Sequence, residues 1–353
     1  MATERLSVVS SEELARLRRE DHPSWIDPML ATLADRPFAE DGWVYERKLD
    51  GIRCLAFRDG PDVRLLSRKR QPLTNTYPEI AQLIAAQEAS DFVIDGEVVA
   101  FEGRRTSFAK LQQRSGVRDP LRARLADVEV FYYVFDLLHI DEYDTRSLPL
   151  TARKQLLRRT ISFGGHLRLT VHRKGNGQDR LAAACKAGWE GLIAKKADSG
   201  YSSRRSTAWL KLKCSQDQEL VVGGFTEPSG SRMGFGALLV GYYDHGKLVY
   251  AGKVGTGFDD KLLRELRTRM NDIERASPPF AGTRRFDRGT HFVEPNLVVE
   301  IGFTEWTRDG MLRHPRFLGL RDDKAALEVT RETPSRRAAG SPHSVMKTPN
   351  AGL

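Results

Sequence analysis

The chain of 353 residues has no apolar run that approaches the ~18 residues a membrane-spanning helix needs. Its N-terminus has no apolar core followed by a cleavage site, so we expect neither export nor a membrane partner. The three cysteines, Cys54, Cys185 and Cys214, form no CxxC pair, which argues against a structural zinc site of that kind. We therefore predict buried free thiols in a cytoplasmic protein.

The composition excludes a disordered chain, because 40% of the residues are hydrophobic and can fill real cores. The length suits two domains. Lys and Arg number 56 against 47 Asp and Glu, a net charge of +9. This basic excess suggests a polyanionic partner, although it also fits a basic protein with no nucleic-acid role.

Local patterns divide the chain into four parts. Ser10 and Glu13 have the spacing of a capping box, which predicts a short helix to about residue 19. We assign residues 1–27 to an N-terminal segment, 28–213 to a domain of alternating strands and helices, 218–330 to a second domain, and 331–353 to a disordered tail.

The second domain is dominated by strands. It has a hairpin signal at residues 242–248 and one helix from 259 to about 270, a combination that fits a small barrel such as an OB-fold. Residues 214–217 form a candidate hinge between the domains. The chain as a whole is therefore predicted to be α+β.

The sequence ERKLDGIR at residues 46–53 has the features of a nucleophilic lysine site. A turn at Asp50 and Gly51 would hold Lys48 at the lip of a sheet. The positive charge of Arg53 would make the neutral amine of Lys48 easier to reach. The same residues also fit a solvated hairpin turn.

Two further segments place charge at predicted strand ends. Arg68 follows a strand and suits a ribose or phosphate oxygen, although an ordinary surface arginine would look the same. The sequence DGE at residues 95–97 is predicted to be a turn between strands 92–94 and 97–101, with Glu97 able to hold a ribose hydroxyl or Mg²⁺. An ordinary Asp-Gly turn is the alternative.

The remaining candidates add an aromatic ring, a second carboxylate and more cations. Phe135 lies in an apolar strand and suits either a core or a nucleobase, and Glu190 precedes a strand and could complete a metal site with Glu97. Lys211 and Lys213 share one face of a strand and would repel unless an anion lies between them, although an exposed amphipathic edge also fits. A charged turn at residues 321–324 contributes Arg321 and Lys324. Together these residues describe a metal-assisted nucleotidyl-transfer site.

In their order along the chain, these segments resemble the motifs of the lysine nucleotidyltransferase superfamily, and within it the ATP-dependent DNA ligases, over residues 28–328. The matching segments are KLDGIR (48–53), SR (67–68), DGE (95–97), FDLL (135–138), EGLIAK (190–195), WLKLK (209–213) and RDDK (321–324). The runs PMLA (28–31) and LRHP (312–315) resemble the compact bacterial and end-joining subgroup. Arg47 departs from the apolar residue found there in many relatives.

The resemblance implies an ATP-grasp-like adenylation domain followed by an OB-fold. It implies that Lys48 forms a lysyl-AMP from ATP, that AMP passes to a 5′-phosphate, and that a 3′-hydroxyl then displaces it. The resemblance also implies roles for the other residues. Phe135 would stack on the adenine, and Glu46 would lie near the base through its backbone. Arg53 and Arg68 would hold ribose or phosphate groups, and Glu97 and Glu190 would bind Mg²⁺ or Mn²⁺. Lys211 and Lys213 would contact the α-phosphate, and Arg321 and Lys324 would reach the site only when the OB-fold closes over it.

The implied partner is nicked or broken duplex DNA in the bacterial nucleoid, held without sequence readout by the pairs Arg104-Arg105, Arg204-Arg205 and Arg284-Arg285. A Ku-like end-binding protein and a separate repair polymerase are further expected partners of a monomeric enzyme. Three alternatives stay open. They are an mRNA-capping guanylyltransferase, against which the run at 28–31 argues, an RNA ligase, and a non-catalytic OB-fold protein.

Overall fold

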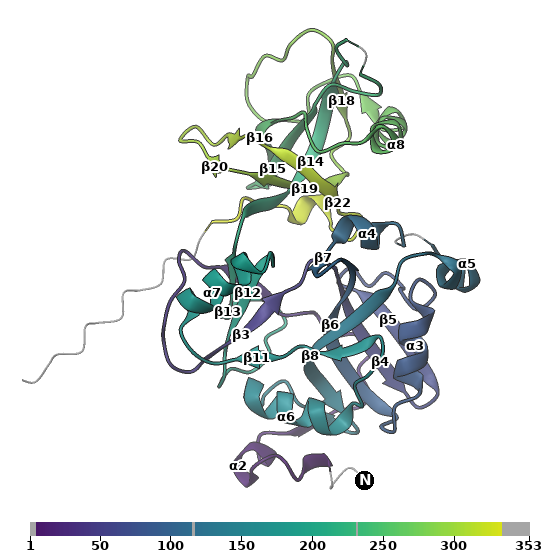
Figure 1. The fold of residues 1–353 in the computed structure, drawn as a ribbon, viewed down its shortest axis with the longest axis vertical. Helices are drawn as coiled ribbons and strands as arrows, with labels where there is room; N and C mark the ends of the chain where they lie inside the picture. Colours follow the sequence, from purple (N-terminus) through teal and green to yellow (C-terminus); the bar gives the residue numbers. More distant parts are fainter. Residues whose placement is uncertain (1–4, 115–116, 231, 334–353) are drawn as a thin grey trace, which may run out of the picture.

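The computed structural model describes residues 5–114, 117–230 and 232–333. Two sheets and most of the helices form a lower body, and a β-barrel stands above it (Figure 1). No helix in the described part of the chain is both long and apolar enough to cross a membrane. The mixed α+β architecture with a C-terminal barrel confirms the predicted fold class.

The larger sheet has the strand order β1-β9-β8-β6-β4-β5, with β10 added beside β8 and β7 beside β6. Its strands are β1 (Arg18–Arg19), β4 (Ile52–Asp59), β5 (Asp62–Ser67), β6 (Asp91–Glu102), β7 (Arg105–Thr106), β8 (Val130–Ile140), β9 (Tyr143–Asp144) and β10 (Leu167–Leu169). The main core of the lower body includes apolar side chains of this sheet and of three helices. These helices are α3 (Pro78–Ala85), α4 (Phe108–Gln112) and α6 (Leu150–Thr160).

The second sheet has the order β11-β3-β12-β13-β2 and packs on a different face of the first. Its strands are β2 (Leu30–Leu33), β3 (Trp43–Lys48), β11 (His172–Arg173), β12 (Gly191–Lys196) and β13 (Arg205–Lys213). A compact apolar cluster joins the sheets through Phe57 of β4, Phe135 of β8 and Trp209 of β13. The short helices α2 (Ser11–Leu14) and α5 (Pro120–Leu125) lie at the periphery, and α7 (Gly177–Lys186) contacts β12.

The barrel is organised by the long strand β14, which pairs with β15, β18 and β19. Its elements are β14 (Gln216–Thr226), β15 (Leu238–Asp244), β16 (Lys247–Val254), α8 (Asp260–Asn271), β17 (Glu274–Arg275), β18 (Thr290–Val293), β19 (Val298–Phe303), β20 (Glu305–Trp306), β21 (Leu312–Arg313), β22 (Arg316–Leu320) and the 3₁₀ turn η1 (Ala326–Glu328). The predicted hairpin is confirmed, because His245 and Gly246 make the β15–β16 turn with φ of 45° and 75°. The predicted helix is also confirmed, with Asp259 as its N-cap.

The predicted turn at residues 95–97 is wrong, because β6 runs unbroken through it. Gly96 instead allows β6 and the neighbouring strand β8 to approach each other closely. A Cβ at this position would lie 2.5 Å from the ring of Tyr132 on the neighbouring strand. The glycine therefore marks a contact between strands, which an Asp-Gly pattern does not distinguish from a turn.

The predicted turn after Lys48 also differs from a hairpin, since β3 and β4 belong to different sheets. Gly51 lies in the crossing between them, and a Cβ there would clash with the carbonyl oxygen of Val98. The N-terminal helix is shorter than predicted. The capping box of Ser10 and Glu13 is present, but α2 ends at Leu14 and β1 follows.

The prediction of three free thiols is wrong for two of them. Cys185 and Cys214 form a disulfide with a Cα–Cα distance of 5.3 Å, whereas Cys54 is free and buried. The antiparallel pairing of Gly191 with Lys213 brings the end of β13 beside the end of α7, and so aligns two cysteines that are 29 residues apart. Of the predicted disordered tail, residues 334–353 lie outside the described residues.

Candidate active site

A cavity of about 210 Å³ lies between the two sheets and the barrel. Every residue predicted from the sequence for the site contributes to its wall: Glu46, Lys48, Arg53, Arg68, Glu97, Phe135, Glu190, Lys211, Lys213, Arg321 and Lys324. Seven separate segments of sequence therefore converge on one pocket.

Lys48 is the last residue of β3 and forms an ion pair with Glu190, which directly precedes β12. The pairing of Lys48 with Gly191 across the two strands brings these side chains together. The Lys48 side chain is only 16% exposed. Burial, followed by the charges of Lys213 and Lys211, lowers the pKa of Lys48 to about 8, although Asp217 and Asp50 partly oppose this.

Arg53 does not supply the charge that was expected to activate Lys48. Its guanidinium makes two hydrogen bonds to Asp95, at 2.5 and 2.6 Å, and lies 4.7 Å from the ring centroid of Phe135. Burial alone would lower the pKa of Arg53, but Asp95 outweighs it and raises it. Because Asp95 compensates its charge, the cations that act on Lys48 are the lysines of β13.

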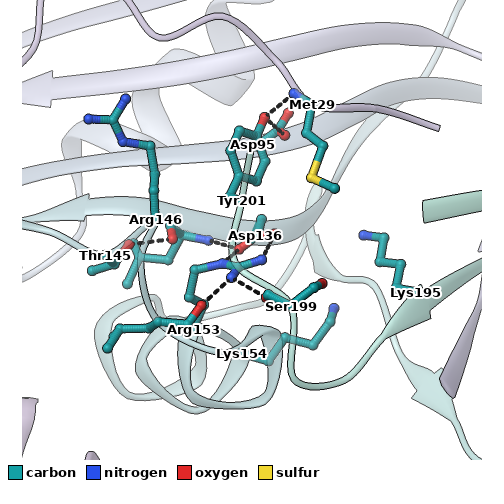
Figure 2. Close-up of polar contacts among 12 residues, drawn as sticks. Met29, Asp95, Asp136, Thr145, Arg146, Arg153, Lys154, Lys195, Ser199 and Tyr201 are labelled. Atoms are coloured by element: carbon teal, nitrogen blue, oxygen red, sulfur yellow. Dashed lines mark hydrogen bonds and ion pairs between the residues drawn. The ribbon is translucent and has the colours of Figure 1, made fainter. Parts of the chain in front are cut away.

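Buried polar contacts with Tyr201, which also contacts Met29, fix the carboxylate of Asp95 (Figure 2). The Tyr201 hydroxyl donates to Asp95 Oδ2 at 2.7 Å and accepts the backbone N–H of Met29 at 2.8 Å. The carbonyl of Met29 in turn accepts a hydrogen bond from Arg53 at 3.2 Å. The sequence places Asp95 and Glu97 on one face of β6, which is the signal that could have identified Asp95.

A second buried pair holds β8 against α6. Arg153 donates to both carboxylate oxygens of Asp136, at 2.7 and 2.9 Å, and to the carbonyls of Leu148 and Ser199 (Figure 2). Both side chains of the pair are fully buried. Asp136 directly follows Phe135, so this contact fixes the strand that carries the aromatic wall of the pocket.

Glu46 lines the pocket together with Lys195 and is paired with two lysines. Its carboxylate pairs with Lys154 of α6 and, at 2.7 Å, with Lys195 of β12, and each of the three side chains is 2% exposed. Burial alone would raise the pKa of Glu46, but the two lysines outweigh it and lower it. The Glu46 side chain thus acts in a buried ion-pair cluster, in addition to any backbone contact with a ligand. Lys195 also lies 3.9 Å from the ring centroid of Trp209.

The carboxylates of Glu97 and Glu190 have the chemistry of a site for a divalent cation. Burial raises the pKa of Glu97 to about 7, against the opposing charges of Arg53 and Arg321. Glu190 Oε2 is buried and has no hydrogen-bond partner among the described residues. Oxygen donors of this kind suit Mg²⁺ or Mn²⁺.

Lys211 and Lys213 share an anion, as their common strand face requires. Both pair with Glu332, and Lys213 also pairs with Asp217 at 2.6 Å. Burial alone would lower the pKa of Lys213, but Glu332 and Asp217 outweigh it and raise it. Glu332 was not a predicted site residue, because it lies in the Pro- and Ser-rich end of the sequence that carries no regular pattern.

The barrel closes the pocket from above. Arg321 is held by Asp323, at 2.9 and 3.0 Å, and by Glu300 at 3.2 Å, while Lys324 pairs with Glu219 at 2.9 Å. Sequence reasoning assigned no role to these three carboxylates. Glu219 and Glu300 lie in barrel strands with no motif of their own, and Asp323 lies inside the charged turn at 321–324, of which only Arg321 and Lys324 were predicted for the site. Below them, Arg68 reaches across to Glu328 of the barrel at 2.6 Å.

The comparison with known families agrees with this geometry. The family described as "ATP dependent DNA ligase domain" matches residues 28–213, and "ATP dependent DNA ligase C terminal region" matches residues 231–324. The chain belongs to the ATP-dependent DNA ligase family. This confirms the resemblance seen in the motifs and favours a ligase over a capping guanylyltransferase or a non-catalytic binding protein.

Similar proteins place this chain beside the end-joining subgroup of the family. The "Multifunctional non-homologous end joining protein LigD" of Pseudomonas aeruginosa is 37% identical over 321 residues, which cover 89% of this chain and 37% of the relative. The corresponding "DNA repair protein LigD" of Mycobacterium tuberculosis is 35% identical over 311 residues, 86% of this chain and 40% of the relative. The chain thus spans about two fifths of the length of these curated relatives.

One solved structure supports the same assignment. A structure described as "mycobacterial DNA ligase D complexed with ATP and MES" has 33% sequence identity and a TM-score of 0.61, and it covers 87% of this chain and 98% of that chain. The shared fold and sequence therefore extend over both bodies of this chain.

Proposed function

We propose that this chain seals nicks or breaks in duplex DNA that carry a 5′-phosphate and a 3′-hydroxyl, using ATP and a lysyl-AMP intermediate. The observation that carries the proposal is the buried, cation-flanked Lys48 at the centre of the pocket. A lysine whose pKa is lowered to about 8 has a useful fraction of neutral amine near neutral pH.

In the first step, the neutral Nζ of Lys48 attacks the α-phosphate of ATP and forms a P–N bond. Pyrophosphate leaves with the electron pair of the broken P–O bond, and the nitrogen releases one proton to solvent. Lys211 and Lys213 hold the negative charge of the α-phosphate, and Arg68 binds a ribose or phosphate oxygen. Phe135 contacts the adenine, and Glu46 contacts the base through its backbone. Arg53 is a positioning residue that is fixed by Asp95 against the ring of Phe135.

Glu97 and Glu190 would hold the divalent cation, Mg²⁺ or Mn²⁺. A cation bound there would neutralise negative charge on the transferring phosphate. The unpaired and buried Glu190 Oε2 supports this assignment.

Arg321 and Lys324 act in the first step, when the barrel is closed over the pocket, and orient the pyrophosphate. In the two later steps AMP passes to the 5′-phosphate of the DNA, and the 3′-hydroxyl then displaces it. The barrel must swing away before DNA can enter. Arg68 and Glu328 hold the closed arrangement by a contact that opening would break.

The DNA would be held through its phosphates. The pairs Arg104-Arg105, Arg204-Arg205 and Arg284-Arg285 are all exposed and can meet phosphates without reading sequence. The similarity to end-joining proteins supports a role in break repair at the nucleoid, with a Ku-like end-binding protein and a separate repair polymerase as partners. We propose that the ligase acts as a monomer.

The deciding experiment is incubation with each α-labelled nucleoside triphosphate and a divalent metal, followed by a denaturing gel. We expect label from ATP only, its loss in Lys48→Ala, and its transfer to nicked DNA. Lys247→Ala, an exposed lysine on the barrel, is the matched control and should label normally.

Other outcomes identify the alternatives. Label from GTP would favour a capping guanylyltransferase, and transfer to RNA alone would favour an RNA ligase. An unlabelled protein would support a non-catalytic role, provided that prior treatment with pyrophosphate, which removes AMP already bound, does not restore labelling. Label that persists in Lys48→Ala would show that the nucleophile is another residue.

A further inference from the structure

A cluster of two histidines and an aspartate lies outside the nucleotide pocket and has no part in the proposed reaction. His22 comes from the N-terminal segment, Asp91 begins β6, and His139 lies near the end of β8. Each residue can offer one ligand atom so that all three atoms lie within 4.8 Å of one another. The register of β6 against β8, which pairs Val93 with His139, brings the two strand residues together.

The two imidazoles are buried, and each has a ring nitrogen without a hydrogen bond to any described residue. The His22 side chain is 9% exposed and that of His139 is fully buried. Within the described residues, Nε2 of each ring has no hydrogen-bond partner. Burying such a group without a partner costs free energy, so the orphaned Nε2 of His139, which faces Asp91, indicates a missing ligand.

The carboxylate of Asp91 already lies between the rings. Asp91 Oδ1 is 2.6 Å from His22 Nδ1 and 3.4 Å from His139 Nε2, and the ring centroids are 5.4 Å apart. The Asp91 side chain is 31% exposed, which leaves the cluster a path to solvent. Ligand atoms on a tetrahedral ion lie about 3.4 Å apart, so a small rotation of these side chains would bring them into range.

We propose that His22, Asp91 and His139 bind a divalent transition-metal ion of the zinc class. Imidazole nitrogens with one carboxylate suit Zn²⁺, whereas Mg²⁺ prefers a shell of oxygen ligands. Three protein ligands leave a fourth position for water. This site therefore differs in chemistry from the carboxylate pair of Glu97 and Glu190.

The position of the cluster indicates what the ion does. Asp91 and Glu97 lie six residues apart on β6, or about 20 Å at the usual rise of a strand, so the ion would take no part in nucleotidyl transfer. The ion would tie the N-terminal segment to β6 and β8. The chain leads directly from that segment to Met29, whose carbonyl accepts a hydrogen bond from Arg53 of the nucleotide pocket. The site would therefore stabilise one wall of the pocket from a distance.

The test uses the full chain, from which a chelator has removed bound metal. The protein is then titrated with Zn²⁺ in a buffer that contains excess Mg²⁺, so that Mg²⁺ occupies the carboxylates of the pocket. We expect one Zn²⁺ per chain, a rise in Tm with Zn²⁺, and the visible absorption of a low-coordinate ion when Co²⁺ replaces it. His22→Gln should weaken Zn²⁺ binding by about tenfold or more and abolish the rise in Tm. Asp91→Asn should do the same.

Two histidine variants serve as controls. His245→Gln removes a side chain that is 96% exposed, and His291→Gln disrupts another grouping, in which a histidine lies 2.5 Å from Glu227 and 2.6 Å from Glu274. Both should retain Zn²⁺ binding. The proposal is overturned if the wild type binds no Zn²⁺, if His22→Gln binds as well as the wild type while circular dichroism shows it folded, or if only His291→Gln loses the ion. His22 lies in a loop, so its variant should fold even if a variant of the fully buried His139 does not.

Discussion

The carboxylate of Glu332 lies 3.2 Å from the ammonium nitrogen of Lys213 and also pairs with Lys211. Its backbone N–H donates to the side chain of Gln218 at 2.9 Å, which pins this segment to β14. Burial alone would raise the pKa of Glu332, but the two lysines outweigh it and lower it to about 2. The ionised carboxylate of Glu332 therefore pairs with the same two lysines that we propose as ligands of the α-phosphate of ATP.

Glu332→Gln should strengthen ATP binding, because the substituted side chain no longer competes as an anion for Lys211 and Lys213. If the competing carboxylate weakens ATP binding by about 1 kcal/mol, its removal would lower the KM for ATP about fivefold, with little change in the maximal rate. The measurement is the initial rate of self-adenylylation against ATP concentration. Glu305→Gln, an exposed change elsewhere on the barrel, should leave the KM unaltered. An unchanged KM in Glu332→Gln would show that the tail does not compete.

Self-adenylylation should depend on pH through Lys48. Below its pKa of about 8 the ammonium form predominates, so the rate should fall about tenfold for each pH unit, and above it the rate should level off. The profile is measured with labelled ATP in single-turnover reactions. Sealing of DNA that already carries AMP does not use the Lys48 amine as a nucleophile and should lack this inflection. The same inflection in both reactions would assign it to another group.

Asp95→Asn should destabilise the protein, because it leaves the Arg53 guanidinium buried without its carboxylate. Asp95 is fully buried and Arg53 is 18% exposed. Removing one partner of such a pair costs about 3–5 kcal/mol in the free energy of unfolding, measured by denaturant titration. Glu305→Gln breaks the exposed pair with Arg313 and should cost under about 1 kcal/mol. Equal losses in the two variants would mean that the Arg53 contact contributes little.

The disulfide should be detectable by alkylation of denatured protein. Without a reductant only Cys54 should react, whereas after reduction Cys185 and Cys214 should react as well. Closing a loop of this length stabilises a fold by about 2–4 kcal/mol, so the double variant Cys185→Ser and Cys214→Ser should unfold at lower denaturant. Cys54→Ser serves as the control for the alkylation, because it should leave no residue that reacts without a reductant. Alkylation of all three residues without reductant would contradict the bond.

The chemistry of the pocket was largely predictable from local patterns. Lys48, Glu190 and Arg68 lie at or beside strand ends, where a change in hydrophobic pattern is visible in the sequence. Lys211 and Lys213 share a strand face, and the period of two predicted that they need a common anion. The sequence could not identify that anion as Glu332, because no local pattern records a contact made over more than a hundred residues.

Side-chain chemistry and strand period, both readable in the sequence, predicted which residue types line the pocket. How these residues are held depends on contacts between distant segments, which appear only in the folded chain. In the folded chain, Gly96 makes a close contact with Tyr132 on the neighbouring strand instead of a turn, and Arg53 pairs with Asp95. The fold also joins Cys185 to Cys214 and places His22 beside His139. Each of these contacts depends on which strands become neighbours, and that choice is made by packing between distant segments.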